Sequence, residues 1–185
     1  VAYMEKASKE AKRHTSWVDP DHAYDEALRA FVEAVCGDDD LIGEVAAFVE
    51  PLVAPGRLNS IAQKLLHLTA PGVPDVYQGT ELWDLSLVDP DNRRPVDYDE
   101  RRRVLVAARS MTPEERWDAA DDGTHKLWVV HRALALRAAH PEWFDAGSYE
   151  PLHVEGSAAG HVVAFARAGH AVTVGPARGA GRVAT

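Results

Sequence analysis

The residue types best suited to chemistry are concentrated in one irregular stretch, residues 71–97, PGVPDVYQGTELWDLSLVDPDNRRPVD. Carboxylates, aromatic rings and two adjacent guanidinium groups alternate along it. Carboxylates and guanidinium groups form directed hydrogen bonds with hydroxyl groups, and aromatic rings can stack on the apolar faces of pyranose sugars. The stretch therefore indicates a carbohydrate-binding loop. The residues concerned are Asp75, Tyr77, Glu81, Trp83, Asp84, Asp89, Asp91, Arg93 and Arg94.

A structural role competes with ligand binding for each of these residues taken singly. We expect Asp89, Asp91 and Arg94 to pair with one another and to hold the loop together, because an acid beside a guanidinium group can form bidentate bonds. For the loop as a whole a functional role is favoured, since ordered loops of this length usually have one. The best candidates to line a sugar pocket are Tyr77 and Glu81, followed by Trp17 and Arg93.

The sequence patterns of other reaction classes are missing. The nine histidines and the single cysteine show no spacing typical of a metal site. Ser60 and Ser86 lie outside any GxSxG nucleophile motif. We therefore expect neither a metal nor any other cofactor.

Composition restricts the class of partner. The 185 residues are 46% apolar and carry a formal net charge of −9, with an isoelectric point near 5.4. Nucleic acids and anionic membranes would be repelled by this charge, whereas neutral ligands would not. The single Cys36 allows no internal disulfide, and no run reaches the ~18 apolar residues of a membrane span, so we expect a cytoplasmic protein.

Apolar periodicity predicts a mainly helical chain up to about residue 145. One helix is expected to begin with Asp19 as N-cap and Pro20 at its first position and to end at Gly37. Another is expected to begin at Asp97, which is spaced from Glu100 as a capping box. Further helices are predicted over residues 40–53, 59–69 and 124–139, and a short buried strand over residues 75–77.

The pattern changes near residues 145–147. SYEPLHV, HVVAFAR and AVTV are short runs of β-branched and aromatic residues that are separated by turn sequences, which predicts an antiparallel β meander. We therefore expect one domain over residues 1–145 and a second over residues 146–185. Because the chain begins at Val1 rather than Met, we also expect it to be a piece of a longer protein.

Several segments carry a resemblance to a known family. GVPDVYQGTE followed by DPDNRRPVD resembles the eighth-strand region of the α-amylase superfamily, the retaining α-glucan enzymes of glycoside hydrolase family thirteen. Together with YMEKASKEAKRHTSW and KLWVVHRALALRAAHPEWF, the loop is most similar to the maltooligosyltrehalose synthases, the (1→4)-α-D-glucan 1-α-D-glucosylmutases. The resemblance implies an α/β fold: the C-terminal portion of a (β/α)8 barrel, with strand eight near 75–77 and a final helix over 124–139, followed by the start of an antiparallel β-sandwich.

The resemblance also implies an activity. These isomerases convert the reducing-end α-1,4 linkage of a maltooligosaccharide into an α,α-1,1 trehalose linkage by retaining intramolecular transglycosylation. Their three catalytic carboxylates follow earlier barrel strands, and none of the corresponding motifs occurs here, so no catalytic residue is expected in this chain and the piece alone should be inactive. The implied partners are the rest of the barrel, the maltooligosaccharide and a hydrolase that releases trehalose, with no nucleic acid or membrane.

Two other interpretations remain open at this point. The chain could belong to a hydrolytic relative such as an α-glucosidase or trehalohydrolase, or it could be a stand-alone carbohydrate-binding or interaction module with Trp17, Trp83 or Trp143 as a stacking surface. The module and the barrel piece differ in whether the chain buries its own apolar faces, as a free module should. A barrel piece should leave helix 59–69 and strand 75–77 without neighbours, exposing Ile61, Leu65, Leu66 and Leu68.

Overall fold

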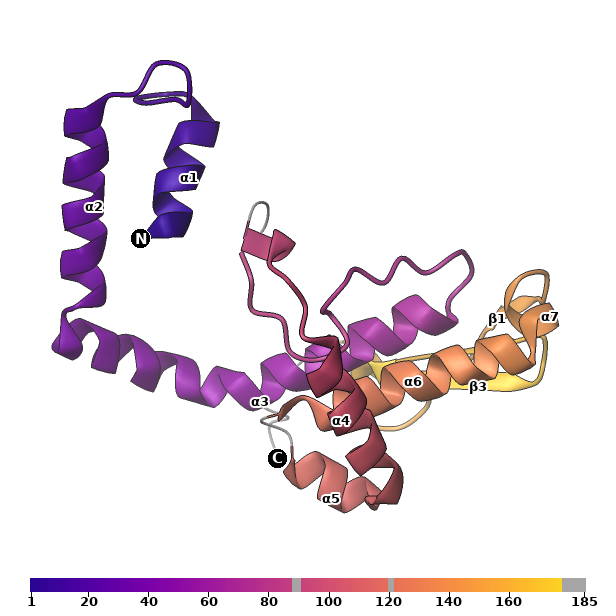
Figure 1. Ribbon diagram of the computed structural model, residues 1–185. Helices are drawn as coiled ribbons and strands as arrows, with labels where there is room; N and C mark the ends of the chain where they lie inside the picture. Colours follow the sequence, from indigo (N-terminus) through magenta and orange to yellow (C-terminus); the bar gives the residue numbers. More distant parts are fainter. Residues whose placement is uncertain (88–90, 120–121, 178–185) are drawn as a thin grey trace. The chain divides into compact units, whose positions relative to one another are not determined.

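The computed structural model describes residues 1–87, 91–119 and 122–177 (Figure 1). It is mostly helical, with one small antiparallel sheet near the C-terminus. Contacts divide the chain into two compact units, the first comprising Val1–Leu52 and Leu85–Pro95 and the second comprising Val53–Asp84 and Val96–Thr185. The division expected at residue 145 concerns domains of a longer protein and stays a prediction.

The first unit contains α1 (Ala2–Ala11) and α2 (His22–Cys36), which pack side by side (Figure 1). The N-cap of α2 is Asp21, whose Oδ1 accepts a hydrogen bond from the backbone N–H of Tyr24 at 3.0 Å. The predicted cap, Asp19, is wrong because its backbone N–H bonds the Ser16 hydroxyl oxygen at 2.8 Å in the preceding turn. The predicted end of the helix at Gly37 is confirmed.

The next helix, α3 (Asp39–Thr69), is a single helix of 31 residues. The prediction of two helices over 40–53 and 59–69 is therefore wrong. The helix continues through Pro51, Pro55 and Gly56, because each proline removes only one backbone N–H donor and the other helical hydrogen bonds still form. The boundary between the two units lies in this proline-containing part, at Leu52 and Val53.

Four more helices follow in the second unit: α4 (Tyr98–Ser110), α5 (Pro113–Asp118), α6 (Thr124–Ala139) and α7 (Pro141–Phe144). Asp97 caps α4 as predicted, because its side chain accepts from the Glu100 N–H at 2.9 Å. The reciprocal half of the capping box does not form, since the Glu100 carboxylate bonds Arg103 instead, at 2.6 and 2.7 Å. The predicted bounds of α6 are confirmed.

The C-terminal strands form the predicted meander. The strands β1 (Tyr149–Pro151), β2 (Val162–Arg167) and β3 (Ala171–Pro176) pair antiparallel in the order β1-β2-β3. Residues 75–77, predicted as a strand, are irregular in this chain, and their place as strand eight of a barrel stays a prediction. A barrel strand is defined by its bonds to parallel neighbours, and in the part of the chain that the structure describes the only sheet is the three-stranded one.

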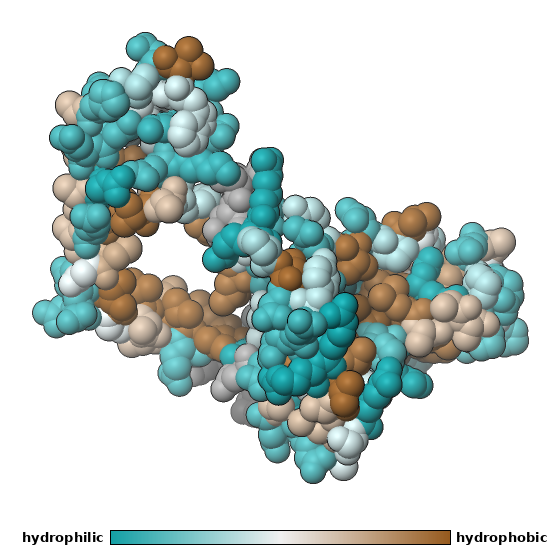
Figure 2. Space-filling model, in the orientation of Figure 1, coloured by the Kyte–Doolittle hydropathy of each residue, from teal (hydrophilic) through white to brown (hydrophobic). Residues whose placement is uncertain are grey.

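The core of the second unit lies where the end of α3 meets α6. Leu68, Val130 and Ala133 are buried together, and Val76 packs against them from the loop that follows α3. The predicted exposure of Leu68 is therefore wrong. Exposed apolar residues instead follow the first part of α3, where hydrophobic side chains gather in Figure 2: Leu41, Ile42, Val45, Phe48, Val49 and Leu52. None of the described helices combines the length and apolarity that crossing a membrane requires.

Candidate functional site

Glu81 is held in place by an arginine from the following helix. Arg101 of α4 donates from Nε to Oε2 of Glu81 at 3.1 Å. Its Nη2 and Nη1 bond the carbonyl oxygens of Gly79 at 2.8 Å and Asp97 at 3.0 Å. One guanidinium group thus ties the loop to the start of α4. Among the described residues none donates a hydrogen bond to Oε1 of Glu81, so this oxygen is left to accept one from a ligand hydroxyl.

A tight turn presents the aromatic ring just before Glu81. The carbonyl oxygen of Tyr77 accepts from the backbone N–H of Thr80 at 3.2 Å and from its hydroxyl at 2.7 Å. Gly79 allows this turn because its φ is +90° and a Cβ there would lie 3.3 Å from Val96. Tyr77 is 44% exposed, which leaves part of its aromatic ring available for stacking, four residues before Glu81.

The next part of the loop is anchored by packing. Trp83 lies edge-on to the ring of His125, with 5.2 Å between the ring centroids, and Trp117 contacts the same histidine at 5.2 Å. Lys126 donates to the carbonyl oxygen of Leu82 at 2.9 Å, and its ammonium lies 5.4 Å from the centre of the Trp83 ring. Trp83 is therefore an anchor of the loop, which argues against its use as an open stacking surface.

Burial sets the electrostatics of this anchor. Desolvation lowers the pKa of His125, with a smaller contribution from the Arg57 charge, and both ring nitrogens are buried with no hydrogen-bond partner among the described residues. Desolvation likewise lowers the pKa of Lys126, and nearby Lys64 adds to this shift, whereas Asp84 and Glu81 oppose it. The Lys126 ammonium therefore lies close enough to the Asp84 and Glu81 carboxylates to interact with both.

The predicted site residues are divided between the two units. Tyr77 and Glu81 lie together in the second unit, whereas Trp17 and Arg93 belong to the first. Trp17 donates from Nε1 to the Glu10 carboxylate at 3.2 Å and leaves 56% of its surface exposed. Arg93 ends the short 3₁₀ helix η1 (Asp91–Arg93) and is exposed.

The predicted pairing of Asp89, Asp91 and Arg94 falls largely outside the described residues. Asp89 is one of the residues that are not described, and the same holds for the Asp91 side chain. Arg94 donates from Nη2 to the hydroxyl oxygen of Ser86 at 3.1 Å, so it does bond within the loop. The mutual pairing stays a prediction, as does its consequence that Arg94→Ala would lower stability more than sugar affinity.

Sequence reasoning missed Arg101, Lys126 and His125. Arg101 sits in the run DERRR, where it reads as one more charge on a solvated helix face. Lys126 and His125 begin a helix whose apolar positions alone were used to define its buried face. No local pattern separates these three side chains from surface charges, because their roles depend on atoms 20 to 44 residues away.

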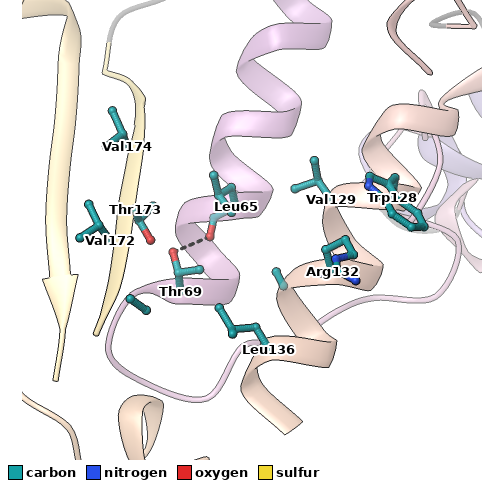
Figure 3. A pocket seen from close by; sticks show the side chains of 11 residues that line it. Leu65, Thr69, Trp128, Val129, Arg132, Leu136, Val172, Thr173 and Val174 are labelled. Carbon is teal, nitrogen blue, oxygen red and sulfur yellow. Dashed lines mark hydrogen bonds between the residues drawn. The ribbon is translucent and has the colours of Figure 1, made fainter. Parts of the chain in front are cut away.

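A separate cavity of about 620 Å³ lies between the ends of α3 and α6 and the strand β3 (Figure 3). Its wall is mostly apolar and includes Leu65, Leu136 and Val172, with Thr69 turned back to bond the Leu65 carbonyl oxygen at 2.8 Å. None of its lining residues belongs to the loop 71–97. Trp128, Arg132 and Thr173 also line the cavity, which is a mainly apolar space between helices and sheet, distinct from the loop.

Comparison with known proteins shows a homology that covers part of a longer protein. No protein-family profile matches the chain. A putative maltooligosyl trehalose synthase of Mycobacterium tuberculosis (strain ATCC 25618 / H37Rv) is 46% identical over 165 residues, which are 89% of this chain and 20% of that protein. The chain is homologous to part of maltooligosyl trehalose synthase.

Solved structures of the synthase agree with this relationship. The maltooligosyltrehalose synthase from Arthrobacter ramosus superposes with a TM-score of 0.74 at 41% identity, over 95% of this chain and 22% of that one. A second crystal structure of maltooligosyl trehalose synthase gives a TM-score of 0.78 at 29% identity, over 92% and 23% of the two chains. The chain thus spans about one fifth of the length of the curated synthases it matches.

Proposed function

We propose that this chain is the C-terminal part of an enzyme that converts the reducing-end α-1,4 linkage of maltooligosaccharides into an α,α-1,1 linkage. The observation that carries the proposal is the 46% identity to a synthase over 89% of the chain. The loop supports it independently, because Tyr77 offers an exposed aromatic face and Glu81 an open carboxylate oxygen a few residues apart.

The reaction would be a retaining double displacement. A carboxylate attacks the anomeric carbon while a carboxylic acid protonates the departing oxygen, and the released glucose then returns its own anomeric hydroxyl to the covalent intermediate. In this proposal both carboxylates, and the barrel strands that carry them, belong to the longer protein. This chain supplies part of the pocket that retains the glucose and keeps water out.

Within that pocket each proposed residue has a distinct task. Tyr77 would stack on a pyranose face, and Oε1 of Glu81 would accept a sugar hydroxyl while Arg101 holds Oε2. Trp17 and Arg93, which belong to the first unit, stay predicted substrate contacts of the full-length protein. No cofactor takes part. The partners would be the rest of the barrel and, functionally, a cytoplasmic hydrolase that releases trehalose.

The stand-alone module is the weaker interpretation. A free module should cover its own apolar faces, yet α3 alone presents six large apolar side chains from Leu41 to Leu52 that are exposed, with Phe48 at 71%. Such a face needs a neighbour. A hydrolytic relative differs from the synthase only in the acceptor, water in place of glucose, so only the products separate these two.

The test is the product of the full-length gene product with maltopentaose. We expect the reducing ends to disappear while the chain length is preserved, and an anomeric nuclear magnetic resonance signal of an α,α-1,1 linkage to appear. Steady release of glucose or maltose with no such signal would indicate the hydrolytic relative instead. Binding of maltopentaose without any conversion would favour the module.

A further inference from the structure

Two arginines from outside α3 occupy the carbonyl groups at its C-terminal end. The last four carbonyl oxygens of an α-helix have no intrahelical donor and carry partial negative charge, so a cation there is doubly favourable. Arg137 of α6 donates to the carbonyl oxygen of Leu68 at 3.0 Å, and Arg167 of β2 donates to that of Thr69 at 3.3 Å. They lie 69 and 98 residues along the chain from their acceptors.

Arg167 is the more unusual of the two. Arg167 is 2% exposed, and its hydrogen bonds within the described part of the chain all go to backbone carbonyl groups: besides Thr69 it bonds Phe144 at 2.7 Å, Gly147 at 3.2 Å and Ser148 at 3.3 Å. Within the described part of the chain no carboxylate pairs with it, although a buried cation normally has such a partner. Four carbonyl groups therefore share the task of holding one guanidinium group.

The backbone around Arg167 is shaped to admit it. Gly147 passes so close to the preceding turn that a Cβ there would lie 2.3 Å from the carbonyl oxygen of Trp143, so any side chain would push the Gly147 carbonyl away from the arginine. The Phe144 ring is 1% exposed and lies under both cations, at 4.9 Å from Cζ of Arg137 and 5.9 Å from Cζ of Arg167. The two arginines and Phe144 thus form one rigid group.

This group contacts the segment that follows α3 and leads to Tyr77. Arg137 also donates to the carbonyl oxygen of Gly72 at 3.3 Å, and His67 accepts from the backbone N–H of Asp75 at 3.1 Å. The next residue, Val76, packs into the buried cluster with Leu68, and Tyr77 follows it directly. These ties between the end of α3 and Tyr77 come from α3 and α6, and Arg167 of the sheet acts just before them, on the last residue of α3, Thr69.

We propose that Arg167 and Arg137 are positioning residues, through which the C-terminal sheet and α6 fix the end of α3 and so set the place of Tyr77 in the pocket. This inference rests on the proposed function, since it gives the loop its task in retaining glucose. Arginine is required, because a lysine ammonium is a single point that leaves most of these carbonyl groups without a donor. A loosened loop would admit water to the covalent intermediate, so that water rather than the retained glucose accepts the maltooligosyl group; the products are then a shortened maltooligosaccharide and free glucose.

The test uses three variants of the full-length gene product: Arg167→Lys, Arg137→Lys and, as the matched control, Arg116→Lys. Arg116 performs the same chemical task elsewhere, because its Nη1 donates to the carbonyl oxygens of Ala108 at 2.8 Å and of Met111 at the end of α4. The first readout is amide hydrogen exchange along the chain. The second is the ratio of free glucose to α,α-1,1 product from maltopentaose, which does not depend on the fraction of enzyme that is folded.

We expect Arg167→Lys to speed exchange in residues 70–80 and to raise the glucose ratio severalfold, with Arg137→Lys weaker and Arg116→Lys equal to wild type. Faster exchange spread evenly over the second unit, or an unchanged glucose ratio with a loosened loop, would overturn the positioning role. If the wild-type protein forms no α,α-1,1 product, the proposed function is wrong. Faster exchange confined to residues 70–80 in Arg167→Lys would even then show that this arginine holds the loop in place.

Discussion

The two compact units of the chain differ in how they use apolar side chains. In the described part of the second unit the end of α3, α6 and the sheet bury Leu68, Val130 and Phe144, among others. In the described part of the first unit only Thr15 and Val32 are buried, while its share of α3 is lined by exposed apolar residues. Amphipathic helices form in both, but only the second unit contains the partners that cover them. The first unit is therefore the part that depends most on a neighbour.

Phe48→Ala should give the largest difference in unfolding free energy between the isolated chain and the full-length gene product. In the chain alone its ring is mostly exposed, so Phe48→Ala should change the free energy of unfolding by no more than about 0.5 kcal/mol. In the full-length gene product, where we propose that the rest of the barrel covers this face, the same change should cost about 3–5 kcal/mol. Chemical denaturation of both proteins measures the difference.

Leu68→Ala is the control for this contrast. Leu68 is completely buried within the second unit, so the substitution should cost about 2–5 kcal/mol in either context. If Phe48→Ala were as harmless in the full-length protein as in the isolated chain, the first unit would need no neighbour and the contrast between the units would fail.

A smaller effect is expected at the loop. Arg101→Ala leaves the Glu81 carboxylate and the carbonyl oxygens of Gly79 and Asp97 without their donor, which should cost about 1–3 kcal/mol. Glu81→Gln keeps an acceptor and the packing, and should lower turnover of maltopentaose while the melting temperature changes little. Wild-type kinetics in Glu81→Gln would remove this residue from the sugar site.

His125 should give the second unit a modest pH dependence. Burial lowers the pKa of His125 in the folded state, so the unfolded chain takes up a proton first as the pH falls. The stability that this histidine contributes should be complete above about pH 6.5 and should decline below it, until the folded state is protonated as well. A His125→Phe variant should lose that part of the decline. Identical pH profiles of the two proteins between about pH 7 and pH 5 would contradict the assignment.

The smallest effect is expected on the exposed face of α4. The Arg103 guanidinium lowers the pKa of Glu100, chiefly through hydrogen bonds, but both groups lie at the surface. Exposed pairs contribute little and are screened by salt. Arg103→Ala should leave the thermal midpoint indistinguishable from wild type at physiological ionic strength. A clear loss of stability that persists in high salt would show that the pair is not merely superficial.

Local patterns predicted well those elements whose determinants lie close together in sequence. The bounds of α6, the end of α2 at Gly37, the cap at Asp97 and the C-terminal meander follow from periodicity, capping residues and turns. The loop between α3 and α4 was expected because prolines, glycines and charges exclude regular structure there.

The incorrect predictions concern features that are determined by contacts between residues far apart in the sequence. The interruption predicted between residues 53 and 59 is absent from α3, and Asp19 satisfied the capping pattern although the Asp21 side chain accepts the capping hydrogen bond. Residues 75–77 have the composition of a strand but no neighbour to pair with. Of the site, Tyr77 and Glu81 could be proposed from their types, whereas Arg101, Arg137 and Arg167 act on carbonyl groups that sequence spacing does not reveal.

We propose that this chain is one part of a synthase whose catalytic carboxylates lie elsewhere in the protein. Residues 1–185 expressed alone, incubated with maltopentaose beside the full-length gene product, test it most directly through the loss of reducing ends. A retaining mechanism needs two carboxylates about 5–5.5 Å apart in a closed pocket, and a (β/α)8 barrel takes ~250 residues to provide one. We expect the full-length protein to consume the reducing ends and the chain alone to leave them unchanged. Reproducible formation of a non-reducing product by residues 1–185 would show that the catalytic carboxylates lie within this chain.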